Sequence, residues 1–235
     1  GAKESINLLR QNNIPCRFIT NTTRMTKKNL VTKLQAMGLT LEVNEVFAAP
    51  HAAVEYCKNM EYTTIDLVVP DNEMEEDFID FDLHAENPQA IVLGDMGNLF
   101  TFDLLNALFK KILNGAEIVA MHKNKYWHSG NGLTLDLGAF VAALEFATEK
   151  EAVVIGKPNP HLFQLAVKPW GLSFQSIYMV GDDIKGDIGG ANNVGMQSIL
   201  VKTGKYREES LKRSEITPDF IINSVADLPE LLQLN

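Results

Sequence analysis

The sequence is poor in cysteine and has no long apolar run. Cys16 and Cys57 are its only cysteines, and they form neither a disulfide framework nor the spacing of a metal site. No apolar stretch approaches the roughly 20 residues that cross a bilayer, and no signal-peptide pattern opens the sequence. These absences predict a reduced, cytoplasmic protein without a membrane partner.

Basic residues are also scarce relative to acidic ones, 21 against 30, which gives a formal net charge of −9 at pH 7. This charge disfavours nucleic acid and anionic membrane as main partners. No Gly-x-Gly-x-x-Gly follows a strand-like segment, which argues against a dinucleotide-dependent oxidoreductase. The 235 residues are 46% hydrophobic and 22% charged, as in ordinary globular proteins of one large or two small domains.

The chain does contain a regular alternation of helix-period and short apolar segments. This alternation is typical of a parallel sheet flanked by helices. Two polar stretches, 71–89 and 122–134, are candidate access or specificity elements, because long loops in compact domains are usually functional. We expect strands at 14–19, 65–69, 90–93, 118–121, 152–155, 176–180, 197–201 and 220–222. We expect helices at 2–12, 26–37, 50–58, 101–114, 137–147, 160–167 and 185–193, with a final helix opened by 224–227. Thr26 is the expected N-terminal cap of the second helix.

Polar side chains follow three of the expected strands. Thr20 and Asn21 follow the strand expected at 14–19, Lys157 follows the strand at 152–155, and Asp182 follows the strand at 176–180. Open α/β sheets place their ligands at the carboxyl ends of strands, so we expect these side chains at one edge of one sheet. Hydroxyl, amide and ammonium groups can hold phosphate oxygens, and a carboxylate can hold Mg²⁺. Phosphoryl transfer requires this combination.

Three carboxylates, Asp182, Asp183 and Asp187, lie within six positions where a strand meets a helix. Such a cluster repels itself unless a hard cation or a protonated partner neutralises it. An ordinary acidic helix start remains an alternative, because Asp is favoured near helix N-termini. The polar residues after the other two strands could likewise end their strands by bonding to the backbone, or lie in turns.

Together these segments resemble a known family. Phe18-Ile19-Thr20-Asn21-Thr22-Thr23, Val154-Ile155-Gly156-Lys157-Pro158 and Val180-Gly181-Asp182-Asp183 with Asp187 resemble motifs II, III and IV of the haloacid dehalogenase (HAD) superfamily. The order of the motifs separates them from receiver domains, whose acidic cluster comes first. The long insert between motifs II and III resembles the large type-2 cap of the branch with the NagD-like and HDHD2-like phosphatases. Lys202-Thr203-Gly204 also resembles that branch.

The resemblance implies catalytic and phosphate-binding roles. Thr20, Asn21 and Thr22 would contribute to the pocket of the transferring phosphoryl group, with Thr20 donating a hydrogen bond to it. Lys157 would neutralise charge between the nucleophile and the phosphoryl oxygens.

The resemblance also implies a Mg²⁺ site and a substrate loop. Asp182 would bind the metal directly, while Asp183 and Asp187 would hold metal-bound waters or orient the loop. A helix-capping role for Asp187 remains open. In the segment 122–128, His122, Lys123 and Asn124 are candidate substrate-binding residues, with a solvated loop as the alternative.

The family's first motif, Asp-x-Asp-Gly-Thr, is absent from the sequence. Leu93-Gly94-Asp95 comes nearest, but it lacks the second Asp and the Gly-Thr. We therefore expect the nucleophilic aspartate upstream of residue 1. A truncated or non-catalytic protein that binds phosphate and Mg²⁺ is the alternative. Without the first strand, apolar surface of its neighbouring strands should be exposed.

We therefore predict an α/β fold in which a three-layer, Rossmann-like core with a parallel sheet carries an inserted α/β cap. The core would comprise residues 1–59 and 149–235, and the cap residues 60–148. The predicted function is Mg²⁺-dependent hydrolysis of a small phosphorylated metabolite, a phosphomonoester, through an aspartyl-phosphate. A homodimer is possible, and the sequence does not name the substrate.

Overall fold

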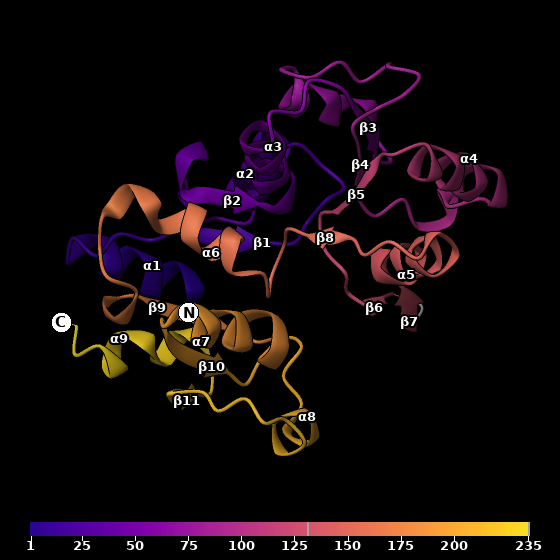
Figure 1. Ribbon diagram of the computed structural model, residues 1–235. Helices are drawn as coiled ribbons and strands as arrows, with labels where there is room; N and C mark the ends of the chain where they lie inside the picture. Colours follow the sequence, from indigo (N-terminus) through magenta and orange to yellow (C-terminus); the bar gives the residue numbers. More distant parts are fainter. Residues whose placement is uncertain (131, 235) are drawn as a thin grey trace. The chain divides into compact units, whose positions relative to one another are not determined.

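The computed structural model describes residues 1–130 and 132–234, and Figure 1 follows them from the indigo N-terminus to the yellow C-terminus. The chain forms two compact units, each assembled from separate segments of the sequence. Unit 1 contains Gly1–Ile19, Lys33–Val46 and Lys157–Asn235, and unit 2 contains Thr20–Thr32 and Phe47–Gly156. Within the described residues, no helix combines the length and apolarity needed to cross a membrane.

Unit 1 is built on a three-stranded parallel sheet in the order β11-β10-β9. Ile199 of the middle strand is paired with Val180 on one side and Phe220 on the other. A core of Leu9, Ile199 and Leu228 packs helices from both ends of the chain against this sheet. The elements of the unit are β9 (Tyr178–Gly181), β10 (Gln197–Val201), β11 (Phe220–Ile222), α1 (Ala2–Gln11), α6 (Pro160–Val167), α7 (Gly190–Val194), α8 (Glu208–Lys212) and α9 (Leu228–Leu231), with a π-helical segment (Ile184–Gly189).

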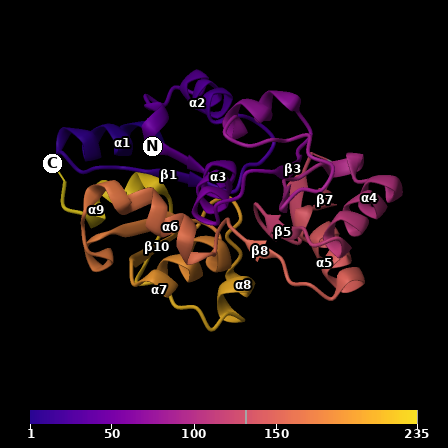
Figure 2. The same cartoon turned by 45° about the horizontal axis from the view of Figure 1, so that its top comes forward.

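Unit 2 is built on a four-stranded parallel sheet in the order β3-β4-β5-β8. All four residues of β4 are buried, as expected for an inner parallel strand covered on both faces. Helices α4 and α5 lie against each other (Figures 1 and 2) and share a core with β4 and β5. The elements are β3 (Ile65–Val68), β4 (Ala90–Leu93), β5 (Glu117–Ala120), β6 (Tyr126–Ser129), β7 (Gly132–Leu135), β8 (Val153–Val154), α3 (Ala49–Asn59), α4 (Phe102–Leu113) and α5 (Leu137–Thr148), with a 3₁₀ segment (Asn72–Phe78).

Three elements contain residues of both units. They are the short strands β1 (Phe18–Thr20) and β2 (Val46–Ala48), which form a two-stranded sheet, and helix α2 (Lys27–Ala36). Helix α2 begins after Thr26, whose hydroxyl accepts a hydrogen bond from the Asn29 amide at 3.1 Å, as the sequence predicted for this helix cap.

The predicted α/β class with a parallel sheet is confirmed, and most predicted elements are present within a few residues. The prediction that the three polar strand ends belong to one sheet is wrong. β8 lies in the sheet of unit 2, where Val153 is paired with Val119 of β5, whereas β9 lies in the sheet of unit 1. Helix α5 provides the crossover from β5, and such a connection places the next parallel strand beside the previous one.

Two further details differ from the prediction. The segment 122–134 contains the antiparallel hairpin of β6 and β7, with Tyr126 opposite Leu135, instead of being a loop throughout. The Asn-Gly pair at 131–132 is typical of a two-residue hairpin turn; residue 131 itself lies outside the described residues. The helix expected at 185–193 begins as the π-helical segment and becomes α-helical only at Gly190.

The two compact units do not follow the boundaries predicted for core and cap. Residues 20–32, 47–59 and 149–156, assigned to the core by the sequence, belong to unit 2 with the expected cap. The boundaries of core and cap stay a prediction.

Neighbouring residues of α4 provide a test of the core of unit 2. Ile112 is fully buried, whereas Leu113 is 56% exposed. Ile112→Ala should lower the free energy of unfolding by about 2–5 kcal/mol because it leaves a cavity. Leu113→Ala should change it by about 0.5 kcal/mol or less. Guanidinium unfolding followed by circular dichroism measures both, and equal losses would contradict this core.

Candidate active site

The carboxyl end of β9 carries the acidic cluster of unit 1. The strand ends at Gly181, and Asp182 and Asp183 lead into the π-helical segment. Asp183 caps this segment, because its Oδ1 accepts hydrogen bonds from the amides of Lys185 at 3.1 Å and Gly186 at 2.9 Å. A side-chain acceptor at this position satisfies amide groups that have no partner within the helix.

Asp187 is the buried member of the cluster, and Lys157 is its cationic partner. Lys157 Nζ lies 2.6 Å from Asp187 Oδ1, and the two side chains are 15% and 6% exposed. The other oxygen, Oδ2, accepts hydrogen bonds from the amides of Asp182 and Asp183, each at 3.1 Å. A Cβ at residue 181 would overlap this carboxylate, so Gly181 is required for the close approach. Asp187 thereby fixes the loop that carries Asp182.

The segment after β10 is bonded to Asp182 and Asp183 through Lys205. The Lys205 amide donates to Asp182 Oδ2 at 2.7 Å, and Lys205 Nζ lies 3.2 Å from Asp183 Oδ2. Gly204 has a φ of +56°, and a Cβ there would overlap the Asp182 carboxylate. Lys205 was not among the predicted site residues, although it directly follows the Lys202-Thr203-Gly204 segment that resembles the family.

The charges of this cluster shift the pKa values of two groups in opposite directions. Burial alone would raise the pKa of Asp183, but the Gly186 amide and the Lys205 ammonium outweigh burial and hold this pKa below its usual value of 3.8. Burial acts to lower the pKa of Lys205, and the nearby Asp183 carboxylate overcomes it, so this pKa is raised. Both shifts keep the pair charged near neutral pH.

The fit of a metal ion differs among the three carboxylates. In the described part of the chain, no three acidic, histidine or cysteine side chains are gathered so as to hold a metal ion. Both carboxylate oxygens of Asp183, and both of Asp187, have hydrogen-bond or ion-pair partners within the cluster. Asp182 has one oxygen on the Lys205 amide. Mg²⁺ often takes only one or two protein carboxylates, so Asp182 fits a single ligand of such a site.

The predicted phosphate-binding residues after β1 form a tight turn in unit 2. Thr20 Oγ1 accepts a hydrogen bond from the Thr22 amide at 3.1 Å and lies 2.9 Å from Thr22 Oγ1. The side chain of Asn21 lies against Gly156, where a Cβ would lie only 2.6 Å from Asn21 Oδ1. The structure therefore brings Thr20 and Thr22 together in unit 2, and Lys157 with the acidic cluster in unit 1.

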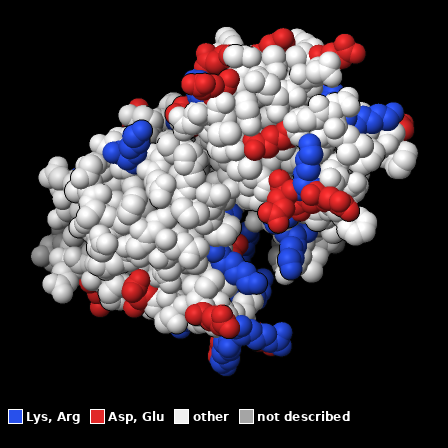
Figure 3. Space-filling model, in the orientation of Figure 1, with Lys and Arg blue, Asp and Glu red and all other residues white. Residues whose placement is uncertain are grey.

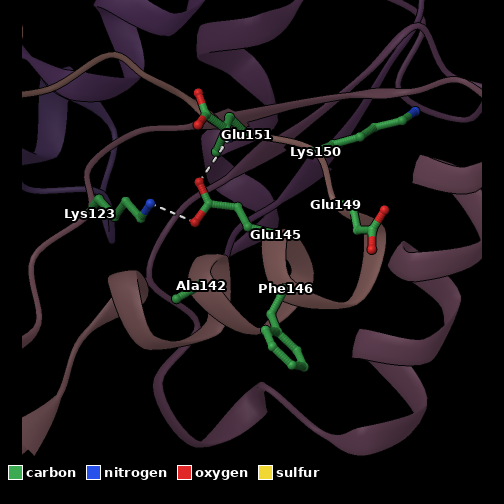
Figure 4. Close-up of a pocket in the computed structure, with 8 residues that line it drawn as sticks. Lys123, Ala142, Glu145, Phe146, Glu149, Lys150 and Glu151 are labelled. Carbon is green, nitrogen blue, oxygen red and sulfur yellow. Dashed lines mark hydrogen bonds and ion pairs between the residues drawn. The ribbon is translucent and has the colours of Figure 1, made fainter.

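The predicted substrate-binding residues His122, Lys123 and Asn124 take part in bonds that hold their own segment. The buried His122 faces Asp136, with Nε2 3.7 Å from Oδ1. Lys123 Nζ lies 2.6 Å from Glu145 Oε2, at the rim of the surface pocket that Figure 4 shows beside α5. The Asn124 carbonyl accepts a hydrogen bond from the Gly138 amide at 2.9 Å. The His128 side chain lies outside the description.

Comparisons with known proteins show the family of the chain. The model of the family described as haloacid dehalogenase-like hydrolase matches residues 1–84, and the HAD-hydrolase-like model matches residues 154–228. The haloacid dehalogenase-like hydrolase domain-containing protein 2 of Bos taurus is 37% identical over 207 residues, 88% of this chain and 78% of its own. The phospholysine phosphohistidine inorganic pyrophosphate phosphatase of Xenopus laevis is 32% identical over 234 residues, 99% of this chain and 85% of its own.

A solved structure has a fold similar to that of this chain. The 4-nitrophenylphosphatase of Thermotoga maritima superposes with a TM-score of 0.89 at 27% identity, covering 97% of this chain and 88% of its own. The chain therefore belongs to the haloacid dehalogenase-like hydrolase family. The predicted superfamily and the predicted class of enzyme, a phosphatase-type hydrolase, are confirmed.

The shifted pKa of Asp183 gives a testable pH dependence. A lowered pKa stabilises the fold above the usual value of 3.8, and this contribution is lost as the pH falls below that value. Asp183→Ala should therefore lower the free energy of unfolding by about 1 kcal/mol at neutral pH, and by progressively less in acid. Urea unfolding across the pH range measures the difference, with Glu215→Gln, at an exposed position of unit 1, as control. A loss that does not change with pH would contradict the assignment.

Proposed function

We propose that the protein is a Mg²⁺-dependent phosphatase that hydrolyses a small phosphomonoester through an aspartyl-phosphate. The observation that carries the proposal is the buried Lys157–Asp187 pair beside Asp182 at the end of a parallel strand. In phosphoryl transfer, catalysis consists mostly of positioning and of stabilising negative charge, and an ammonium with a fixed position does both. The attacking carboxylate is the one that we predict upstream of residue 1.

Lys157 would bind the phosphoryl oxygens through its ammonium. Asp187 holds that ammonium at 2.6 Å, and the Ile19 carbonyl accepts a longer hydrogen bond from it at 3.5 Å. Both contacts restrict the direction of Nζ, so the charge needs little rearrangement when substrate binds.

Asp182 would hold Mg²⁺, which supplies charge neutralisation at a phosphoryl oxygen when it is bound. The backbone amides of Asp182 and Lys205 set the direction of this side chain, the first through Asp187 and the second directly. Asp183 and Asp187 would support the loop rather than bind the metal. The hydroxyls of Thr20 and Thr22 and the amide of Asn21 would donate hydrogen bonds to the phosphoryl group.

The relatives support a phosphorylated substrate. Two of them are named as phosphatases, one for phospholysine, phosphohistidine and inorganic pyrophosphate and one for 4-nitrophenyl phosphate. A small phosphorylated metabolite in the cytoplasm is therefore the proposed substrate. On the face drawn in Figure 3, Lys and Arg lie in small groups, several of them beside Asp and Glu, and form no broad basic surface. This mixture does not favour nucleic acid as a partner, and a homodimer stays a proposal.

The role of Lys157 can be tested on p-nitrophenyl phosphate with Mg²⁺. We expect hydrolysis by the chain extended at its N-terminus with a strand ending in Asp-x-Asp-Gly-Thr. In that chain, Lys157→Arg should lower kcat by about a hundredfold or more, because the guanidinium cannot occupy the same position. Lys212→Met is the matched control, since Lys212 also lies 2.6 Å from a carboxylate, that of Glu208, but is exposed.

Several outcomes distinguish the alternatives. Full activity of Lys157→Arg would remove Lys157 from the catalytic site. No hydrolysis by the extended chain, together with retained binding of phosphate, would favour a non-catalytic binding protein. Hydrolysis by the unextended chain would show that another residue of this sequence is the nucleophile.

A further inference from the structure

Asp95, the acidic residue nearest to a nucleophile motif in the sequence, is a buried anchor in unit 2. Its side chain is 8% exposed. Oδ2 accepts hydrogen bonds from Nε of Arg24 at 2.9 Å and lies 2.9 Å from its Nη2, while Oδ1 accepts one from the Gly97 amide at 2.9 Å. A buried carboxylate bonded in this way is held in one position. Asp95 therefore positions other groups.

The same turn holds the loop that follows β1. The Asp95 amide donates to the hydroxyl of the buried Thr23 at 2.9 Å. Gly94 lies close to this loop as well, because a Cβ there would be 3.3 Å from the Thr23 carbonyl oxygen. Two successive loop residues, Thr23 and Arg24, are thus bonded to one residue at the end of β4. The loop with the proposed phosphate-binding residue Asn21 has its position fixed from this side.

Arg24 also connects this loop to the hairpin of β6 and β7. The centre of its guanidinium lies 5.7 Å from the centroid of the Trp127 ring. Gly97, with a φ of +54°, leaves room for Arg24, because a Cβ at residue 97 would lie 2.5 Å from Nη2. A planar guanidinium can bond to a carboxylate along its edge and stack on an aromatic ring with its face. Arg24 thus has both kinds of partner.

Trp127 is the aromatic side chain of this segment that is tied to the loop after β1. It is 37% exposed, so part of its surface remains accessible. The neighbouring Tyr126 lies on the opposite face of the hairpin, because successive side chains of a strand point to opposite sides. His122 and Lys123, which the sequence suggested for substrate binding, have their own acidic partners.

We propose that Trp127 is a specificity residue for a planar aromatic leaving group, and that Asp95 and Arg24 are its positioning residues. The proposal rests on the proposed phosphatase function. Asp95 fixes Arg24, and Arg24 fixes the orientation of the Trp127 ring relative to the loop of Asn21. An aromatic leaving group would stack on the accessible part of this ring, whereas an aliphatic one would gain nothing from it.

The test compares p-nitrophenyl phosphate with glycerol phosphate in the active, N-terminally extended chain. Trp127→Ala, Arg24→Lys and Asp95→Asn should each raise KM for the aromatic substrate by about three- to tenfold. For Trp127→Ala, the KM for glycerol phosphate and both kcat values should stay near those of the unchanged chain. Arg24→Lys and Asp95→Asn also affect the Asn21 loop, so they should weaken binding of both substrates, and that of the aromatic one more strongly. Lys58→Met is the matched control, since it removes the exposed Lys58–Asp80 pair of the same unit.

The possible failures are distinguishable. Equal changes for both substrates in Trp127→Ala would show that Trp127 has no role in specificity, and an unchanged KM for the aromatic substrate would overturn that role as well. Arg24→Lys decides the outcome if Asp95→Asn does not fold, because the Arg24 side chain is 41% exposed. If the unchanged chain hydrolyses neither substrate, the proposed function fails and the leaving-group role fails with it.

The positioning role can then still be measured by fluorescence. The chain has two tryptophans, so Trp170→Phe leaves Trp127 as the single reporter. In this background, Arg24→Lys and Asp95→Asn should change the emission of Trp127 and its quenching by acrylamide, while Lys58→Met should not. The same spectrum in all variants would overturn the coupling.

Discussion

The organisation of the candidate site depends on the ion pair between Lys157 and Asp187. Both side chains are largely buried, and removal of one partner from such a pair typically costs about 3–5 kcal/mol, because it leaves an unpaired buried charge. One oxygen of Asp187 holds Lys157, and the other holds the amides that lead into Asp182 and Asp183. A single carboxylate thus sets the position of a cation and the direction of the neighbouring acidic loop.

Unit 2 also contains a buried carboxylate that is bonded to a cationic side chain and to a backbone amide. Asp95 is buried, accepts a backbone amide with one oxygen and binds the guanidinium of Arg24 with the other. In both units glycines permit the close approach, Gly181 beside Asp187 and Gly97 beside Arg24. Each buried carboxylate is fully bonded, which offsets the cost of burying its charge. The loops with the proposed functional groups are therefore held by the protein before any substrate binds.

The sequence predicted where strands and helices lie better than it predicted which strands pair with each other. The apolar runs of β4 and α4 and the cap at Thr26 depend on nearby residues, and all three were predicted correctly. The predicted sheet of β8 was wrong, because the position of β8 depends on pairing with a distant residue, Val119. The motifs indicated Lys157 and Asp187, but the bonds of Lys205 to the cluster and of Lys123 to Glu145 join distant segments. No local pattern indicates such bonds, and the substrate-binding role of Lys123 stays a prediction.

The most direct measurement of the central claim is the Mg²⁺ dependence of p-nitrophenyl phosphate hydrolysis by Asp182→Asn, compared with the unchanged N-terminally extended chain. The amide keeps the shape of the side chain and its acceptor oxygen for the Lys205 amide, but it removes the charge that would hold the metal. We predict that half-maximal activity will require far more Mg²⁺ and that kcat will fall by about a hundredfold or more. An unchanged Mg²⁺ requirement and an unchanged kcat would contradict the account.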